Sequence, residues 1–232
     1  MTIIKQNRSI IPACDVATLD ELKKLVLDTY EVKGIGAYKI GFELVIPYGM
    51  KKVVETIRNI TDHPIIYDHQ KAATDIPDTG KKFMDACKGA DAVILFPQAG
   101  PNTEEAWIKA ANEAGMKIIV GGEMTHKGYL ESDNGFLNDN MPVRAYTIAA
   151  NLGVTDFVVP GNKPAKILEY RKMLEAMGVK PIFYSPGLVT QGGSITDGAK
   201  AAGDSWHAIV GRGIYQAEDM KKAAEELARE LV

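Results

Sequence analysis

The sequence predicts an α/β protein, a single (β/α)8 TIM barrel in which eight strands alternate with eight helices. Three observations predict it. Short runs rich in Val and Ile alternate with longer amphipathic stretches from end to end. The 232 residues accommodate eight such units at about 29 residues each, a normal size for the repeat. Gly115, Gly153 and Gly178 each stand where a helix would end, in the position that favours a left-handed backbone, and a strand follows each of them.

The predicted strands are mostly continuous apolar runs, as expected for parallel strands that are buried on both faces. In chain order they are Ser9–Asp15, Gly36–Gly41, Pro64–Asp68, Ala92–Pro97, Lys117–Gly121, Asp156–Pro160, Lys180–Ser185 and Trp206–Gly211. The predicted helices lie between the strands and carry apolar residues at helical spacing. They are Leu19–Tyr30, Tyr48–Ile60, Ile76–Lys88, Thr103–Ala114, Pro142–Leu152, Lys163–Met177, Ile195–Ala202 and Glu218–Leu231.

Strict alternation of strand and helix indicates a parallel sheet, and eight units favour a closed barrel over an open, doubly wound sheet. No linker rich in Pro, Gly or Ser and no shift in composition divides the chain, so we expect residues 1–232 to form one domain. The longest irregular stretch, Glu123–Met141, is expected to be a loop after the fifth strand.

The composition narrows the class of protein. Hydrophobic residues make up 46% of the chain and charged residues 25%, which argues against disorder, collagen and coiled coil. A net charge of −3 argues against an electrostatic nucleic-acid binder. Two cysteines, Cys14 and Cys87, are too few for a disulfide framework and suit a reducing compartment. Without a signal-peptide pattern or an apolar run of about 18 residues, we expect a cytoplasmic protein with no membrane partner.

Charged side chains gather where the predicted strands end, which is the end of a barrel that carries the active site. Taken singly, each could be an ion pair or a helix cap. Together they are harder to explain as scaffold, because buried charges are costly unless they alternate in sign. The set comprises Asp15, Lys39, Asp68, Lys71 and Asp75, and polar residues after the fifth strand add Glu123, Thr125 and His126.

Two glycine-containing loops predict a phosphate site. Residues 186–194 (PGLVTQGGS) follow the seventh strand, and Gly211-Arg212-Gly213 follows the eighth. Glycines allow backbone N–H groups to converge on an anion, and an arginine adds a bidentate contact. The alternative is that both are merely tight turns, but loops after strands seven and eight are the usual phosphate site of this fold. We therefore expect a phosphorylated small-molecule substrate. No dinucleotide fingerprint, nucleophile elbow or zinc-ligand spacing is present.

The candidate residues fall into six segments. They are Cys14-Asp15-Val16, Tyr38-Lys39-Ile40-Gly41, Asp68 to Thr79 with Lys71 and Asp75-Ile76-Pro77-Asp78-Thr79, Glu123-Met124-Thr125-His126, Pro186-Gly187 with Gln191-Gly192-Gly193, and Val210-Gly211-Arg212-Gly213-Ile214-Tyr215. In this order, and over nearly the whole chain, they resemble the orotidine 5′-phosphate decarboxylase family in its short archaeal and bacterial forms. Each segment alone is a weak signal, whereas the set is quite specific.

The chain departs from that family at its central motif, which is normally Asp-x-Lys-x-x-Asp. Here Lys71 lies one residue further from Asp68, and Asp75 one residue further from Lys71. Residues i and i+2 of a strand share a face, whereas i and i+3 point oppositely. Lys71 can therefore reach the site only if the strand ends or bulges near His69 and Gln70.

The resemblance implies a carboxy-lyase, a carbon–carbon lyase that converts orotidine 5′-phosphate to UMP and CO₂ in de novo pyrimidine synthesis. It implies neither cofactor nor metal. Lys71 would stabilise the ring carbanion and protonate it, Asp68 would crowd the substrate carboxylate, and Lys39 would bridge Asp68 to the ribose. The remaining implied residues are Asp15 at the ribose, Thr125 at the pyrimidine, and Pro186, Gln191, Gly192, Gly193, Gly211 and Arg212 at the phosphate.

The resemblance also implies a homodimer with shared active sites, in which Asp75, Ile76 and Thr79 reach the site of the neighbouring subunit.

Two alternative functions remain. One is a related Mg²⁺-dependent sugar-phosphate decarboxylase or synthase barrel, which has an acidic residue at the strand-two position; Lys39 argues against it because it would repel the ion. The other is a catalytically silent barrel that binds a phosphate ligand. Retention of Lys39, Lys71, Asp68 and Asp75 argues against that.

Overall fold

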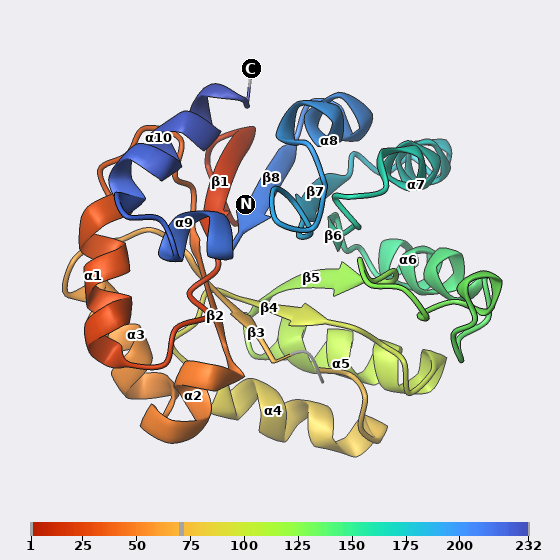
Figure 1. Ribbon diagram of the computed structural model, residues 1–232. Helices are drawn as coiled ribbons and strands as arrows, with labels where there is room; N and C mark the ends of the chain where they lie inside the picture. Colours follow the sequence, from red (N-terminus) through yellow and green to blue (C-terminus); the bar gives the residue numbers. More distant parts are fainter. Residues whose placement is uncertain (1, 70–71, 232) are drawn as a thin grey trace.

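Eight parallel strands form the ring that the alternating pattern predicts, with the helices around it (Figure 1). The computed structural model describes residues 2–69 and 72–231. The strands are β1 (Arg8–Pro12), β2 (Tyr38–Gly41), β3 (Ile65–Asp68), β4 (Ala92–Leu95), β5 (Lys117–Gly121), β6 (Asp156–Val158), β7 (Ile182–Ser185) and β8 (Trp206–Val210).

From β2 to β8 each strand pairs in parallel with the next along the chain, and β8 pairs in parallel with β1. Between β1 and β2, single bridges join Ile10 to Ile35 and Ala13 to Lys39, and the Cys14 N–H donates to the Lys39 carbonyl at 2.8 Å. The sheet is therefore nearly closed. This confirms the (β/α)8 barrel and excludes the open, doubly wound alternative.

The helices occupy most of the predicted places. They are α1 (Leu19–Thr29), α2 (Phe42–Tyr48), α3 (Met50–Arg58), α4 (Gly80–Ala86), α5 (Pro101–Glu113), α6 (Met141–Asn151), α7 (Pro164–Ala176), α8 (Ile195–Ala202), α9 (Arg212–Tyr215) and α10 (Met220–Arg229), with 3₁₀ turns η1 (Pro77–Thr79) and η2 (Glu131–Asp133). Gly115, Gly153 and Gly178 follow α5, α6 and α7 with φ of +69°, +84° and +80°, as predicted.

Two helical predictions were wrong in their bounds, and two short helices were not predicted. The helix predicted as Tyr48–Ile60 is α3, which begins only at Met50. The unpredicted α2 precedes it and ends at Gly49, whose φ is +79°. The segment predicted from Ile76 begins as the 3₁₀ turn η1, with Pro77 as its first residue, and becomes α-helical only at Gly80. The turn after β8 is the short helix α9.

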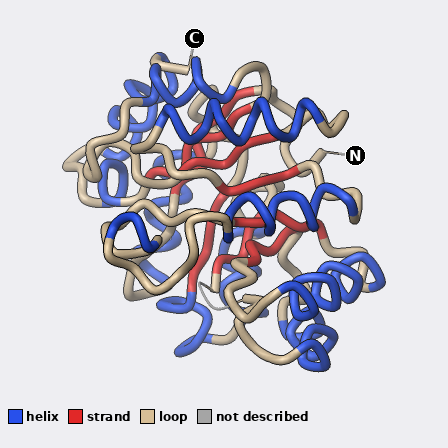
Figure 2. The backbone as a smooth tube through the Cα atoms, turned by 90° about the vertical axis from the view of Figure 1, so that its right-hand side faces the viewer, coloured by secondary structure: helices blue, strands red, loops and turns tan. Residues whose placement is uncertain are grey.

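Two apolar layers fix which side chains reach the site. One lies inside the ring and includes Ile11, Ile66, Ile94, Ile119 and Ile209, while the larger one lies between strands and helices. In Figure 2 the strands run side by side through the molecule, with helices flanking them. Because side chains alternate along a strand, the inward positions at the carboxyl ends continue the series from the inner layer.

Within the described part of the chain, no helix is long and apolar enough to cross a membrane.

Candidate active site

A cavity of about 240 Å³ opens at the carboxyl ends of the strands. Side chains from strands far apart in the sequence line it, with Ile94, Phe96, Val158 and Ile209 among its apolar walls. Of the site residues that the resemblance implies, eight line this cavity, and Glu123 lines it as well. The eight are Asp15, Lys39, Asp68, Thr125, Pro186, Gln191, Gly211 and Arg212.

Asp15, Lys39 and Asp68, which we call the charge set, lie on one side of the cavity. The Lys39 Nζ is 3.3 Å from Asp15 Oδ1 and 3.3 Å from Asp68 Oδ2. The side chains of Lys39 and Asp68 are 9% and 7% exposed, and that of Asp15 is 42% exposed. β2 and β3 pair with Gly41 opposite Asp68, which brings the two strand ends together.

Burial alone would lower the pKa of Lys39, but the charges of Asp68 and Asp15 and their hydrogen bonds outweigh it and raise the pKa. Lys39 therefore remains a cation at neutral pH. The carboxylates of Asp15 and Asp68 lie on either side of this cation, and such alternation of sign lowers the free-energy cost of burying the charges.

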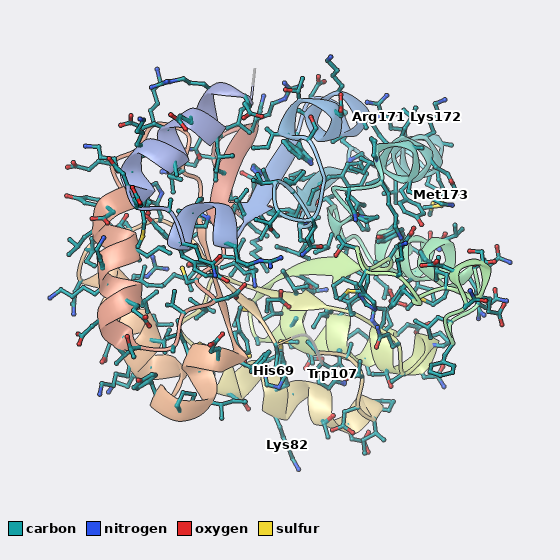
Figure 3. The ribbon with its side chains drawn as sticks, viewed as in Figure 1. His69, Lys82, Trp107, Arg171, Lys172 and Met173 are labelled. Carbon is teal, nitrogen blue, oxygen red and sulfur yellow. The ribbon has the colours of Figure 1, made fainter. Side chains whose placement is uncertain are left out.

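The strand that carries Asp68 ends at that residue. His69 turns to the helix side, where its Nδ1 is hydrogen-bonded to the Tyr67 hydroxyl and its ring packs edge-on against Phe83 (Figure 3). Ala73, four residues after His69 in the sequence, has a φ of +62°. The backbone at Ala73 is therefore not extended, and the face rule of a strand does not hold there. Gln70 and Lys71 themselves lie outside the described residues.

Asp75, Ile76 and Thr79 do not line the cavity of their own chain. Their backbone is held by α5, because Thr103 Oγ1 donates to the Asp75 carbonyl at 2.9 Å and Trp107 Nε1 donates to the Ile76 carbonyl at 3.1 Å. The side chain of Ile76 projects outward from this anchored backbone.

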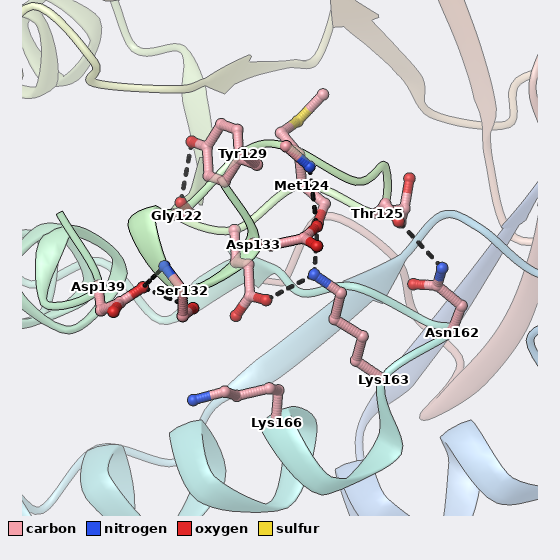
Figure 4. A network of polar contacts seen from close by, with 12 residues as sticks. Gly122, Met124, Thr125, Tyr129, Ser132, Asp133, Asp139, Asn162, Lys163 and Lys166 are labelled. Carbon is pink, nitrogen blue, oxygen red and sulfur yellow. Dashed lines mark hydrogen bonds and ion pairs between the residues drawn. The ribbon is translucent and has the colours of Figure 1, made fainter. Parts of the chain in front are cut away.

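A polar network supports the cavity wall that follows β5 (Figure 4). The buried Glu123 accepts from Lys163 Nζ at 2.8 Å and from the Tyr170 hydroxyl. The same Nζ donates to the Met124 carbonyl at 3.2 Å, and Asn162 Nδ2 donates to the Thr125 carbonyl at 3.0 Å. We did not predict Asn162 or Lys163 from the sequence. The signal available was a polar pair between a predicted strand and Pro164.

The loop after β7 forms another part of the cavity wall. Gly187 and Gly192 have φ of +86° and +85°, and Val189 has a φ of +61°, which is rare for a β-branched residue. The loop closes on itself, because the Gly193 N–H donates to the Gly187 carbonyl and the Val189 N–H to the Gly193 carbonyl, at 3.2 and 2.9 Å.

Gly192 and Gly193 do not line the cavity, and the Gly192 N–H donates to the Val189 carbonyl at 3.2 Å. The polar groups that this end of the cavity presents to an anion include the Gln191 amide and the exposed Arg212 guanidinium. Among the residues from 2 to 69 and from 72 to 231, no group of three or more His, Cys, Asp and Glu is arranged to hold a metal ion.

A family model described as "Orotidine 5'-phosphate decarboxylase / HUMPS family" matches residues 8–227. The chain belongs to this family. Among its curated relatives, the orotidine 5′-phosphate decarboxylase of Methanosarcina mazei is 33% identical over 230 residues, covering 98% of this chain and 97% of that protein. The relative from Pyrococcus abyssi is 31% identical over 226 residues, covering 96% of this chain and 98% of that protein.

Solved structures of the decarboxylase family have the same fold. The Methanocaldococcus jannaschii enzyme in complex with the inhibitor BMP has a TM-score of 0.84 at 27% identity, covering 97% of this chain and 98% of that one. The Pyrococcus horikoshii enzyme has a TM-score of 0.78 at 27% identity, covering 96% and 98%. The resemblance inferred from six sequence segments is thereby confirmed at the level of family and fold.

Proposed function

We propose that this chain decarboxylates orotidine 5′-phosphate to UMP, a carboxy-lyase reaction of pyrimidine biosynthesis. The observation that carries the proposal is the charge set in a cavity that Gln191 and Arg212 also line. The cavity therefore combines fixed, alternating charges with groups suited to a phosphate. This is the arrangement that a charged ring on a phosphorylated sugar requires.

The chemistry explains why fixed charges are needed. When the bond to CO₂ breaks, its electron pair stays on a ring carbon that has no aligned π-system to accept it. Stabilisation must come from charges that are already oriented in a site with little water. Lys71 would provide the cation beside the carbanion and then its proton, so that the ring carbon gains hydrogen and the lysine is left neutral until solvent reprotonates it.

The charge set prepares that step. Asp68 would crowd the substrate carboxylate and hold Lys71, while Lys39 holds Asp68 from the other side at 3.3 Å. Because Lys39 also contacts the half-exposed Asp15, the two residues together would bind the ribose hydroxyls. The charges are in place before substrate arrives, so little reorganisation is needed during the reaction.

Other residues of the site would bind the remainder of the substrate. Thr125 would contact the pyrimidine, and Pro186, Gln191, Gly192, Gly193, Gly211 and Arg212 would surround the phosphate. Gly192 and Gly193 use their N–H groups within the loop, so the loop must rearrange before those groups can serve the phosphate. Binding energy from the phosphate would then favour the closed loop and contribute to the rate.

We further propose that the active form is a homodimer. Asp75, Ile76 and Thr79 lie away from the cavity of their own chain, on a backbone anchored to α5. An anchored segment that projects polar and apolar side chains outward is suited to complete a site across a two-fold interface. Asp75 would then extend the alternating charges of the neighbouring site.

The Mg²⁺-dependent sugar-phosphate alternative is less compatible with this cavity. Such a site would need an acidic ligand where β2 carries Lys39, and the Lys39 ammonium lies between the two carboxylates instead. A cation at that position repels a divalent ion and neutralises the ligands that would bind it.

The test is a spectrophotometric assay of orotidine 5′-phosphate decarboxylation, run with and without EDTA. We expect turnover that EDTA does not change. Turnover that disappears with EDTA and returns with Mg²⁺ would favour the metal-dependent alternative. Binding of UMP without any turnover would indicate the catalytically silent barrel.

A further inference from the structure

The segment between β6 and α7 touches both walls of the cavity without lining it. The Gly161 N–H donates to the Pro186 carbonyl at 2.8 Å, on the wall that follows β7. Asn162 Nδ2 donates to the Thr125 carbonyl and Lys163 Nζ to the Met124 carbonyl, on the wall that follows β5 (Figure 4). Three consecutive residues, which we call the bridge segment (Gly161–Lys163), therefore connect the two walls.

The bridge segment has little freedom to move. A Cβ at Gly161 would lie 2.6 Å from the Pro186 carbonyl oxygen and 2.9 Å from a Leu188 methyl group, so the backbone is packed directly against the β7 loop. At its other end the Lys163 N–H donates to the Pro160 carbonyl at 3.0 Å, and Pro164 starts α7 with its φ already restricted. The segment can therefore act as a rigid spacer.

The hydrogen bonds of the bridge segment are reinforced by a charge pair. Lys163 Nζ is 2.8 Å from Glu123 Oε1, and the Glu123 carboxylate is buried whereas Lys163 is one-third exposed. A buried carboxylate requires its partner cation, so Lys163 is fixed in one orientation. In that orientation it also reaches the Met124 carbonyl.

Thr125 is the point at which the two walls meet. A Cβ at Gly187 would lie 2.6 Å from Thr125 Cγ2, so the threonine packs on the glycine of the β7 loop. Any shift of Thr125 therefore changes the separation between the proposed pyrimidine and phosphate ends.

We propose that Asn162 and Lys163 are positioning residues for the decarboxylation. They set the place of Thr125 relative to the phosphate loop, and neither touches the substrate. This inference rests on the proposed function, because the place of Thr125 matters only if the cavity binds a pyrimidine.

The first experiment compares kcat/KM for orotidine 5′-phosphate in Asn162→Ala, Lys163→Met and the control Lys166→Met. Lys166 lies one turn further along α7, is exposed, and pairs with Glu169. We expect Asn162→Ala and Lys163→Met to lower kcat/KM by roughly tenfold or more, the scale of one lost positioning hydrogen bond. Lys166→Met should stay within about twofold, and the conservative Lys163→Arg within about threefold.

The second experiment tests whether Asn162 acts through Thr125. If it does, the double variant Thr125→Ala/Asn162→Ala should be no slower than Thr125→Ala alone, because the side chain being positioned is already gone. Multiplied losses would mean that Asn162 acts by another route and would overturn the proposal. Wild-type kcat/KM in Asn162→Ala would overturn it as well.

A third measurement does not depend on activity. Backbone amides of residues 122–127 in the unliganded protein should exchange hydrogen faster in Lys163→Met than in Lys166→Met, since only the first releases the Met124 carbonyl. If Lys163→Met fails to fold, Asn162→Ala decides the outcome, because it leaves no buried charge unpaired. A wild-type protein without turnover would refute the proposed function, whereas an active wild type with unaffected variants would refute only the bridge segment's role.

Discussion

Lys39 illustrates how a buried charge can be both a structural and a functional group. Its ammonium lies 3.3 Å from Asp15 and from Asp68, and the second of these carboxylates is as buried as the lysine. Removal of Lys39 would take from the buried Asp68 a cation at 3.3 Å and so raise the cost of burying its charge. The ion pair therefore stabilises the charged form of Asp68, and the same geometry holds Asp68 in place for substrate.

The first residue-scale prediction concerns Lys71, which we assign as the proton donor. Lys71→Ala should reduce kcat by many orders of magnitude, because both the cation and the proton are lost, while UMP still binds through the phosphate end. Single-turnover kinetics and UMP titration measure the two effects separately. A variant that keeps more than about a tenth of wild-type kcat, a loss below ~1.4 kcal/mol in barrier, would contradict the assignment.

The second concerns Glu104 of α5, which lies outside the cavity. Its side chain is 2% exposed and its Oε1 has no hydrogen-bond partner among the described residues. Burial, with a smaller effect of Glu105, raises the pKa of Glu104 to about 8. The folded protein therefore holds a proton that the unfolded chain releases above about pH 4.5. The titration of Glu104 therefore does not reduce the free energy of unfolding below pH 4.5, and reduces it progressively as the pH rises from 4.5 toward 8.

In Glu104→Gln the side chain is uncharged in both the folded and the unfolded protein, so the free energy of unfolding should not fall with rising pH on its account. We expect it to stabilise the fold at pH 8 by on the order of a few kcal/mol and to have little effect near pH 4.5. Thermal unfolding at the two pH values measures the difference. Glu105→Gln, at an exposed neighbour paired with Lys109, is the comparison and should have a much smaller effect, because it removes only the lesser cause of the raised pKa of Glu104. An equal gain at both pH values would point to packing instead of titration.

At the scale of elements, the strands and the charge set could be predicted and several connections could not. Continuous apolar runs mark buried parallel strands, and period-two alternation places Lys39 and Asp68 at the inward carboxyl ends of β2 and β3. Asp15 follows three residues after the end of β1. The helix α2 contains Pro47, a residue that argues against helix, and Gly49 separates it from α3. Local patterns could not reveal this division.

The site residues that we did not predict were also beyond the reach of local sequence patterns. Lys163 and Glu123 are 40 residues apart in the chain, and their contact depends on how far the loop after β6 reaches toward β5. Side chains that act by reaching across neighbouring loops have no sequence spacing of their own. The internal hydrogen bonds of the β7 loop likewise depend on positive φ at Val189, which the sequence does not indicate.

The element-scale prediction concerns α9, whose first residue is Arg212. Arg212→Ala should weaken binding of orotidine 5′-phosphate by roughly 2–4 kcal/mol, the scale of a lost charged hydrogen-bonding partner. The nucleoside orotidine, which has no phosphate, should be almost indifferent. Steady-state kinetics with both substrates makes the comparison, and equal losses for the two would show that Arg212 does not contact phosphate.

At the scale of the whole molecule, the question is whether one barrel forms a complete active site or shares it with a second subunit, and the segment after β3 bears on this. Ile76 is 59% exposed although its carbonyl is fixed by Trp107. An apolar side chain held outward on an anchored backbone suits contact with a second subunit. In an isologous dimer this contact occurs twice, so each site would take Lys71 from one chain and Asp75 from the other.

Complementation tests this arrangement directly. Lys71→Ala and Asp75→Asn homodimers should each be nearly inactive. When equal amounts are unfolded and refolded together, about half of the dimers should be mixed, and each mixed dimer would carry both lesions in one site and none in the other. Activity should therefore return to roughly a quarter of wild type. If Asp75 served its own chain, every site of a mixed dimer would carry one lesion. Mixed dimers demonstrated by mass spectrometry but without recovered activity would place Asp75 in the site of its own chain.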